Sequence, residues 1–144
     1  MCKVYALAGL RVGFALGRPE VIQAMAPYRP PGSVSVVSVS IAADLLDDDQ
    51  VLESGRARIE HERTRLAAAL ARAGWHVYPS VTNFLLVDFG SAERCAEVAE
   101  SLLQRGLVPR TFPAGHPLAS CLRITVRNEE QDDRLIAAAR EIGT

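Results

Sequence analysis

The sequence predicts a chain of mixed α/β to α+β class, with a short N-terminal segment, one long linking helix and a small layer of strands and helices. Two observations support this class. Apolar residues recur at helical spacing over Gln50–Ala73. After Gly74, β-like and helical runs follow one another in the order β-β-α-β-β-α, separated by glycine, proline and serine. Such an order favours a mostly antiparallel sheet whose helices pack on one face.

The N-terminal segment has the pattern of a strand followed by a helix. Leu10–Leu16 is apolar on both of its alternating faces, which is typical of a buried strand. Pro19 suits the first turn of a helix over Pro19–Ala26, where the missing amide would have no helical partner. The run Tyr28–Ser33 (YRPPGS) contains the strongest breakers in the chain. We therefore expect a domain junction or hinge at this run.

Two helices are expected next. Ser35–Leu46 is predicted to be helical, although its β-branched valines lower the helix propensity. The longer helix, Gln50–Ala73, carries one apolar stripe and ends at Gly74, a residue type that commonly terminates helices. The stripe consists of Leu52, Ile59, Leu66, Leu70 and Ala73.

Four short β-like runs and two capped helices are predicted for the remaining residues. Ser91 is suited to N-cap a helix that reaches Gln104, and Gly106 follows its end. Asn128 is expected to cap the last helix, with Gln131 as its capping-box partner. The expected strands are Trp75–Tyr78, Asn83–Phe89, Leu107–Phe112 and Cys121–Val126, and the buried stripe of the last helix is Leu135, Ile136, Ala139 and Ile142.

Composition excludes several classes of function. The chain has 144 residues, with 16 basic and 17 acidic side chains and a net charge of -1, so charge gives no reason to expect nucleic acid or an anionic membrane as a partner. Cys2, Cys95 and Cys121 form no CxxC pair, which favours free thiols in a reducing cytoplasm. No histidine has a metal-spaced partner, so no metal site is predicted. We expect a cytoplasmic protein.

The first residues contain a lysine and an arginine eight positions apart, in the run KVYALAGLRVGF that begins at Lys3. A single lysine in such a segment is usually only solvated. The whole run, however, resembles the signature around the Schiff-base lysine of fold-type I pyridoxal-phosphate (PLP) aminotransferases, S-K-x-[FY]-G-L-A-G-L-R-x-G-[YF]. Within that group it is most similar to the histidinol-phosphate type.

The resemblance implies that Lys3 is the catalytic lysine and that it binds the cofactor PLP, because its amine would reach the cofactor aldehyde. It also implies that Arg11 binds the cofactor phosphate, for which a planar guanidinium supplies two parallel donors. Two residues depart from the family pattern. Cys2 replaces a serine or threonine whose hydroxyl often touches the phosphate, and Ala6 replaces a common glycine.

A second arginine, Arg123, lies in the run LRITV, with its side chain predicted to point opposite to those of Leu122 and Ile124. An exposed strand arginine without a function is the commoner case. The resemblance nevertheless implies that Arg123 grips the substrate α-carboxylate. Arg127 follows the strand where the family often has glycine.

Two further candidates are weaker. Asn83 within PSVTNF matches a P-S-x-x-N-F pattern of the same family, but a turn asparagine before a core phenylalanine explains it equally well. His116 in the loop Gly115–Pro117 precedes the Arg123 strand, although loop histidines are more often solvated.

The resemblance also implies a domain division and an assembly. Residues 1–32 would be the end of the large PLP-binding domain, and residues 33–144 the small C-terminal domain. The family's chains are longer, so we expect this chain to be truncated and its activity alone to be uncertain. Family members are homodimers that act on small amino-acid and keto-acid substrates. Alternatives are an aromatic aminotransferase, a threonine-phosphate decarboxylase, and a non-catalytic α+β fragment or interaction module.

Overall fold

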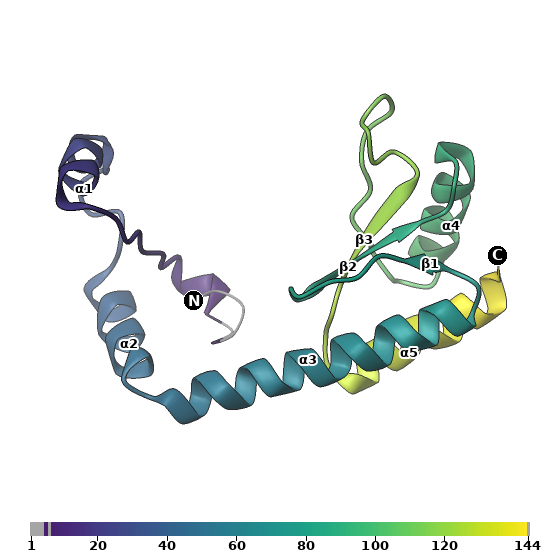
Figure 1. Ribbon diagram of the computed structural model, residues 1–144, viewed down its shortest axis with the longest axis horizontal. Coiled ribbons are helices and arrows are strands. Elements are labelled where there is room, and N and C mark those ends of the chain that lie inside the picture. Colours follow the sequence, from purple (N-terminus) through teal and green to yellow (C-terminus); the bar gives the residue numbers. More distant parts are fainter. Residues whose placement is uncertain (1–4, 6, 144) are drawn as a thin grey trace. The chain divides into compact units, whose positions relative to one another are not determined.

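The computed structural model describes Tyr5 and residues 7–143, which fall into two compact units divided between Ala57 and Arg58 (Figure 1). Lys3 and Cys2 lie outside the described residues. In chain order the elements are η1 (Ala8–Leu10), α1 (Pro19–Met25), η2 (Ala26–Tyr28), α2 (Val36–Leu46), α3 (Asp49–Arg72), β1 (His76–Val77), β2 (Phe84–Asp88), α4 (Ala92–Gln104), β3 (Cys121–Thr125) and α5 (Glu129–Ile142).

The first unit consists of short helices and irregular backbone. The prediction of a buried strand over Leu10–Leu16 is wrong, because no strand forms there and Leu16 is 90% exposed. An extended segment needs a neighbouring strand to pair its amides and carbonyls, and the described part of this unit contains no strand. The helix expected from Pro19 is confirmed, as is the α2 helix, whose Ser35 hydroxyl accepts the amide hydrogen of Ser38.

The second unit contains a three-stranded antiparallel sheet in the order β1-β2-β3. The longest pairing aligns Phe84 with Thr125 and Asp88 with Cys121. The mostly antiparallel sheet is confirmed, but the fourth predicted strand is not. Leu107–Phe112 forms only one isolated bridge, at Arg110, because Pro109 and Pro113 cannot donate backbone hydrogen bonds to a ladder.

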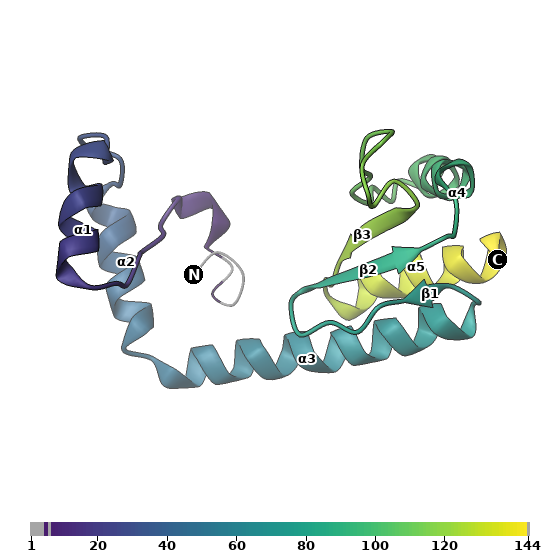
Figure 2. The same ribbon diagram turned by 45° about the horizontal axis from the view of Figure 1, so that its top comes forward.

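One face of this sheet is buried against helices. Leu85 and Val87 of β2 lie opposite Ile124 and Leu122 of β3, and all four are at most 4% exposed. They belong to one core cluster with residues of α3, α4 and α5, in which the stripe residues Leu66 and Leu70 are fully buried. The three helices therefore cover a single face of the sheet, as predicted (Figures 1 and 2).

Both caps predicted for this unit are present. The Ser91 hydroxyl accepts the amide hydrogen of Arg94 at 3.1 Å, and the Asn128 side chain accepts that of Gln131 at 3.1 Å. Gly106 adopts a left-handed φ of 72° just after α4, a conformation that favours glycine. These local signals fix where α4 and α5 begin.

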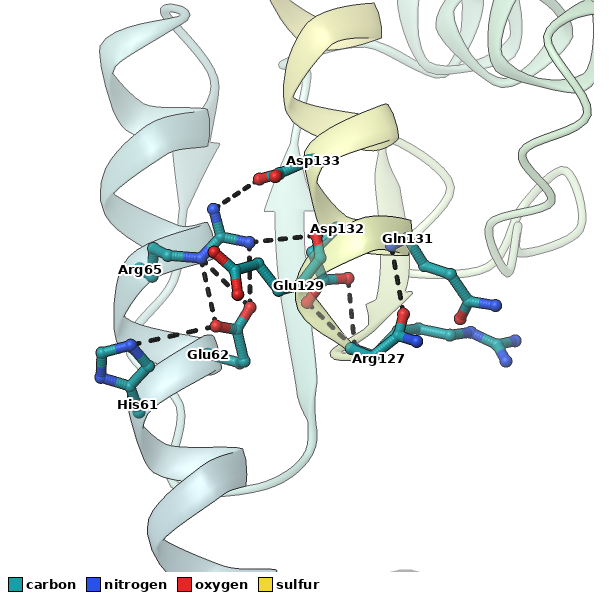
Figure 3. Close-up of polar contacts among 9 residues, drawn as sticks. His61, Glu62, Arg65, Arg127, Glu129, Gln131, Asp132 and Asp133 are labelled. Atoms are coloured by element: carbon teal, nitrogen blue, oxygen red, sulfur yellow. Dashed lines mark hydrogen bonds and ion pairs between the residues drawn. The ribbon is translucent and has the colours of Figure 1, made fainter.

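A polar junction joins α3 to α5, which run beside each other in both ribbon views (Figures 1 and 2). The Arg65 guanidinium donates to both Glu62 carboxylate oxygens at 3.0–3.2 Å and to Asp133 at 2.6 Å (Figure 3). Next to this fork, both carboxylate oxygens of Asp132 accept the backbone N–H of Arg127. Asp132 and Glu62 are only 2% and 5% exposed, so two buried carboxylates occupy this junction.

Candidate functional site

Arg11 is the one predicted cofactor residue that lies within the described part of the chain. It ends η1 in the left-handed backbone region, with φ of 55°, which is uncommon for a residue other than glycine. Its guanidinium donates to the Ala8 carbonyl at 3.1 Å, and the side chain is exposed. This local bond holds one arm of the guanidinium while the rest of the fork faces solvent.

Arg123 lies in the middle of β3, on the face of the sheet opposite the helices. Its neighbours Leu122 and Ile124 are buried in the core, whereas Arg123 itself is exposed, so the predicted direction of the side chain is confirmed. The guanidinium carbon lies 4.4 Å from the centroid of the Phe84 ring on β2. At this distance a cation–π contact orients the guanidinium plane over the ring.

A second arginine, Arg110, lies beside Arg123 and was missed by the sequence analysis. The two residues exchange both backbone hydrogen bonds, at 3.0 and 2.9 Å, in an isolated antiparallel bridge. Residues paired in this way project to the same face. Pairing the predicted Leu107–Phe112 run with the Cys121–Val126 run would have placed the two arginines opposite each other.

The arginine pair lines an open depression of about 360 Å³, which also contacts Val108, Pro109, Thr111 and Thr125. Two guanidinium groups on one small surface create a positive potential, and threonine hydroxyls can add neutral donors. The depression is therefore suited to a carboxylate or phosphate group. We define it as the Arg110–Arg123 depression.

The two weaker candidates have local structural roles. The His116 Nδ1 accepts the amide hydrogen of Leu118 at 3.0 Å, and the imidazole stacks on Phe112 with ring centroids 5.0 Å apart. The Asn83 carbonyl accepts the Val126 amide hydrogen at 2.9 Å, which extends the β2–β3 pairing by one bond. These contacts give His116 a structural role in its loop and Asn83 a structural role at the end of the sheet.

The described residues contain no group of three histidine, cysteine or acidic side chains that could hold a metal ion. Within the same residues no helix is both long and apolar enough to cross a membrane. Arg11 belongs to the first unit and Arg123 to the second. The two arginines are therefore treated as separate candidates for binding an anion.

Comparison with known proteins assigns the chain to a family. The sequence is 38% identical over 140 residues to the histidinol-phosphate aminotransferase of Anaeromyxobacter sp. and 40% identical over 134 residues to histidinol-phosphate aminotransferase 1 of Ralstonia nicotianae. These matches cover 97% and 92% of this chain but only 38% and 35% of the relatives.

The fold agrees with that assignment. The crystal structure of histidinol-phosphate aminotransferase from Sinorhizobium meliloti, in complex with pyridoxal-5'-phosphate, superposes with a TM-score of 0.86 at 31% identity, over 96% of this chain and 38% of that one. The chain thus spans little more than a third of the relatives it matches. The family model described as aminotransferase class I and II matches residues 1–138, and the chain belongs to this family.

Proposed function

We propose that this chain is the part of a PLP-dependent aminotransferase that supplies the substrate anion site, and that the enzyme is of histidinol-phosphate type. The main support for this proposal is the Arg110–Arg123 depression, which lies on the face of the sheet opposite the helix-covered core. The similarity to histidinol-phosphate aminotransferases supports the choice of substrate class. In this proposal the enzyme exchanges an amino group between glutamate and imidazole-acetol phosphate.

Arg123 is proposed to bind the substrate α-carboxylate. A guanidinium and a carboxylate make two parallel charge-assisted hydrogen bonds, which fix both the position and the plane of the substrate. Phe84 lies under the Arg123 guanidinium, so less side-chain entropy is lost when the anion binds. The rigid β2–β3 pairing then determines where the amino group of the substrate is held.

Arg110 is proposed to extend the same site to a second anion. Glutamate presents carboxylates, whereas histidinol phosphate carries a phosphate and no carboxylate. One depression must therefore accept either anion in turn. Two adjacent guanidinium groups serve this purpose better than one, because a phosphate carries more charge and three strong acceptor oxygens.

The cofactor assignment rests on Arg11 and Lys3. The exposed, partly fixed guanidinium of Arg11 fits a phosphate group, and it would hold that of PLP. When bound, PLP supplies an electron sink for the substrate carbon that loses its proton. Lys3, outside the described residues, is proposed to hold the cofactor covalently and to move this proton, as its place in the family signature implies.

The larger assembly is proposed on the same basis. Residues 1–32 would complete the large cofactor-binding domain, and residues 33–144 would form the small domain. A homodimer in the cytoplasm, acting on amino acids and keto acids, follows from the family. These statements concern the whole enzyme, of which this chain spans little more than a third in the relatives compared.

PLP binding and turnover test the proposed function. Purified chain is titrated with PLP, and Schiff-base absorbance is compared between the wild type and Lys3→Ala. Amino transfer from glutamate to imidazole-acetol phosphate is then measured for the chain alone and in a chimera in which it replaces the matching third of a complete relative. Arg123→Ala should raise the KM for glutamate in the chimera, while Arg94→Ala on α4 should not. A chimera that binds PLP but shows the same KM with Arg123→Ala would refute the anion-site assignment.

A non-catalytic module is the second candidate, and one observation favours it. The second unit contains the whole principal core cluster, so it has the means to fold without cofactor. A folded monomer whose unfolding temperature and spectrum do not change on adding PLP would support this alternative.

A further inference from the structure

A second cavity lies at the start of α5, next to the Arg110–Arg123 depression but lined by different cations. Its volume is about 310 Å³, at the low end of the range of about 300–1,000 Å³ that is typical of small-molecule sites. It shares Val108, Pro109 and Thr125 with the depression, whereas its guanidinium groups are those of Arg127 and Arg134. We call it the α5 cavity.

The two arginines of the α5 cavity are free to meet an anion. Neither of them takes part in an ion pair within the described residues. The Arg134 guanidinium makes one long hydrogen bond, of 3.4 Å, to the Arg105 carbonyl, which holds it over the turn that ends α4. The Arg127 side chain extends away from Asp132, alongside Gln131, which also lines the cavity (Figure 3).

The carboxylate of Asp132 does not neutralise these cations through a side-chain pair. Both of its oxygens accept the backbone N–H of Arg127, and the side chain is 2% exposed. Asp133, the next residue of this helix, pairs with Arg65 of α3. Asp132 and Asp133 are thus both engaged in hydrogen bonds, and the polar lining of the cavity consists of two guanidinium groups, the Gln131 amide, Thr125 and the bonded, buried Asp132.

Half of the residues that line the cavity are apolar. They are Leu102, Leu107, Val108, Pro109, Ile124 and Leu135. Cations and aliphatic side chains in one cavity are complementary to a small molecule with a charged head and an apolar body. Phosphate esters without an apolar part would leave these aliphatic side chains uncovered.

We propose that the α5 cavity binds a small organic carboxylate with an aliphatic body, with Arg127 and Arg134 holding the carboxylate. The site is separate from the anion site of the proposed aminotransferase and needs no cofactor. The ligand would bind beside the substrate face without occupying it.

Titration of the full chain with hexanoate tests the proposal, with backbone amide shifts followed by NMR in the absence of PLP. Hexanol is the uncharged probe of the same length, and acetate is the anion without an apolar body. We expect hexanoate to shift the amides of Gln131, Arg134 and Leu107 in a saturable way, and to bind at least about tenfold more tightly than either control probe.

Variants locate the site. Arg127→Gln with Arg134→Gln should weaken hexanoate binding by about tenfold or more, since each removes a charge-assisted hydrogen bond. Arg127→Gln retains the backbone N–H that Asp132 accepts, so the α3–α5 junction is kept. Arg94→Gln is the matched control and should leave binding unchanged. Equal affinity for hexanol, unchanged binding in the double variant, or shifts confined to the residues around Arg110 and Arg123 would each overturn the proposal. Because no step uses PLP, failure here leaves the aminotransferase proposal untouched.

Discussion

Asp132→Asn provides a test of the buried junction between α3 and α5, because the folded chain makes this carboxyl harder to ionise. The pKa of Asp132 is raised from 3.8 to about 6, chiefly by burial and in part by the nearby Glu62 carboxylate. The Arg127 backbone N–H opposes this shift, since it donates to the charged form. The net effect is that ionising Asp132 costs more in the folded chain than in the unfolded one.

The sign and size of the effect follow from linkage. Between pH 3.8 and about 6 the folded state holds a proton on Asp132 that the unfolded state has lost, so the free energy of unfolding falls as the pH rises through this window. The stability that this group contributes is complete below pH 3.8 and is lost above about pH 6. A shift of roughly two pKa units corresponds to about 3 kcal/mol.

Urea unfolding at pH 4, 5, 6 and 7.5 measures this free energy, with Trp75 as the reporter. Trp75 is the only tryptophan, is 3% exposed and lies in the core of the second unit. As the pH rises from 4 to 7.5, the wild type should lose the contribution of Asp132 and the variant should not. The free energy of unfolding of Asp132→Asn should therefore rise relative to that of the wild type by up to about 3 kcal/mol. Asparagine stays neutral and its oxygen can still accept the Arg127 amide hydrogen.

Using the difference between two proteins removes the contributions of the other carboxyl groups. One of these, Asp88, has its pKa lowered by the Gly90 backbone N–H and the Ser120 hydroxyl, so it favours folding with the opposite pH dependence. Glu130→Gln is the control, because it makes the same charge change at an exposed position of α5. If the stability of Asp132→Asn depended on pH as that of the wild type does, the assignment of a raised pKa to Asp132 would be wrong.

Two other substitutions test the same unit. Arg65→Met should lower the free energy of unfolding by about 3–5 kcal/mol, because it leaves the buried Glu62 carboxylate without its partner. Adding Glu62→Gln should recover part of that loss in the same urea assay, and no recovery would contradict a buried ion pair. Ser91→Ala should cost about 1 kcal/mol by removing the cap of α4, whereas Ser91→Asp should keep most of the stability. Equal destabilisation by alanine and aspartate would count against the capping role.

The features predicted correctly are those whose causes are local in sequence. Ser91 and Asn128 each accept an amide hydrogen only three residues away, so the spacing alone determines the start of α4 and α5. The direction of Arg123 follows from strand alternation, and its buried neighbours confirm it. Lys3 lies outside the described residues, and its role stays a prediction from the family signature.

The features that failed or were missed depend on distant residues. Leu10–Leu16 has the composition of a strand but no strand beside it among the described residues of its unit, and its Phe14 and Leu16 side chains are exposed. Arg65 and Asp133, which meet at the α3–α5 junction, are 68 residues apart in sequence. Single-sequence periodicity contains no information about such pairs, because it reports only which face of an element is apolar.

The sheet register of the second unit bears directly on the proposed anion site at the Arg110–Arg123 depression. Arg123 alternates with Leu122 and Ile124, whose burial prevents β3 from sliding by one residue without exposing the core. Arg110 is tied to the same strand by two backbone bonds, so its side chain shares that register. The core of the second unit thus fixes the backbone positions of the two arginines, and a substitution such as Leu122→Ala should weaken anion binding at the proposed site together with stability.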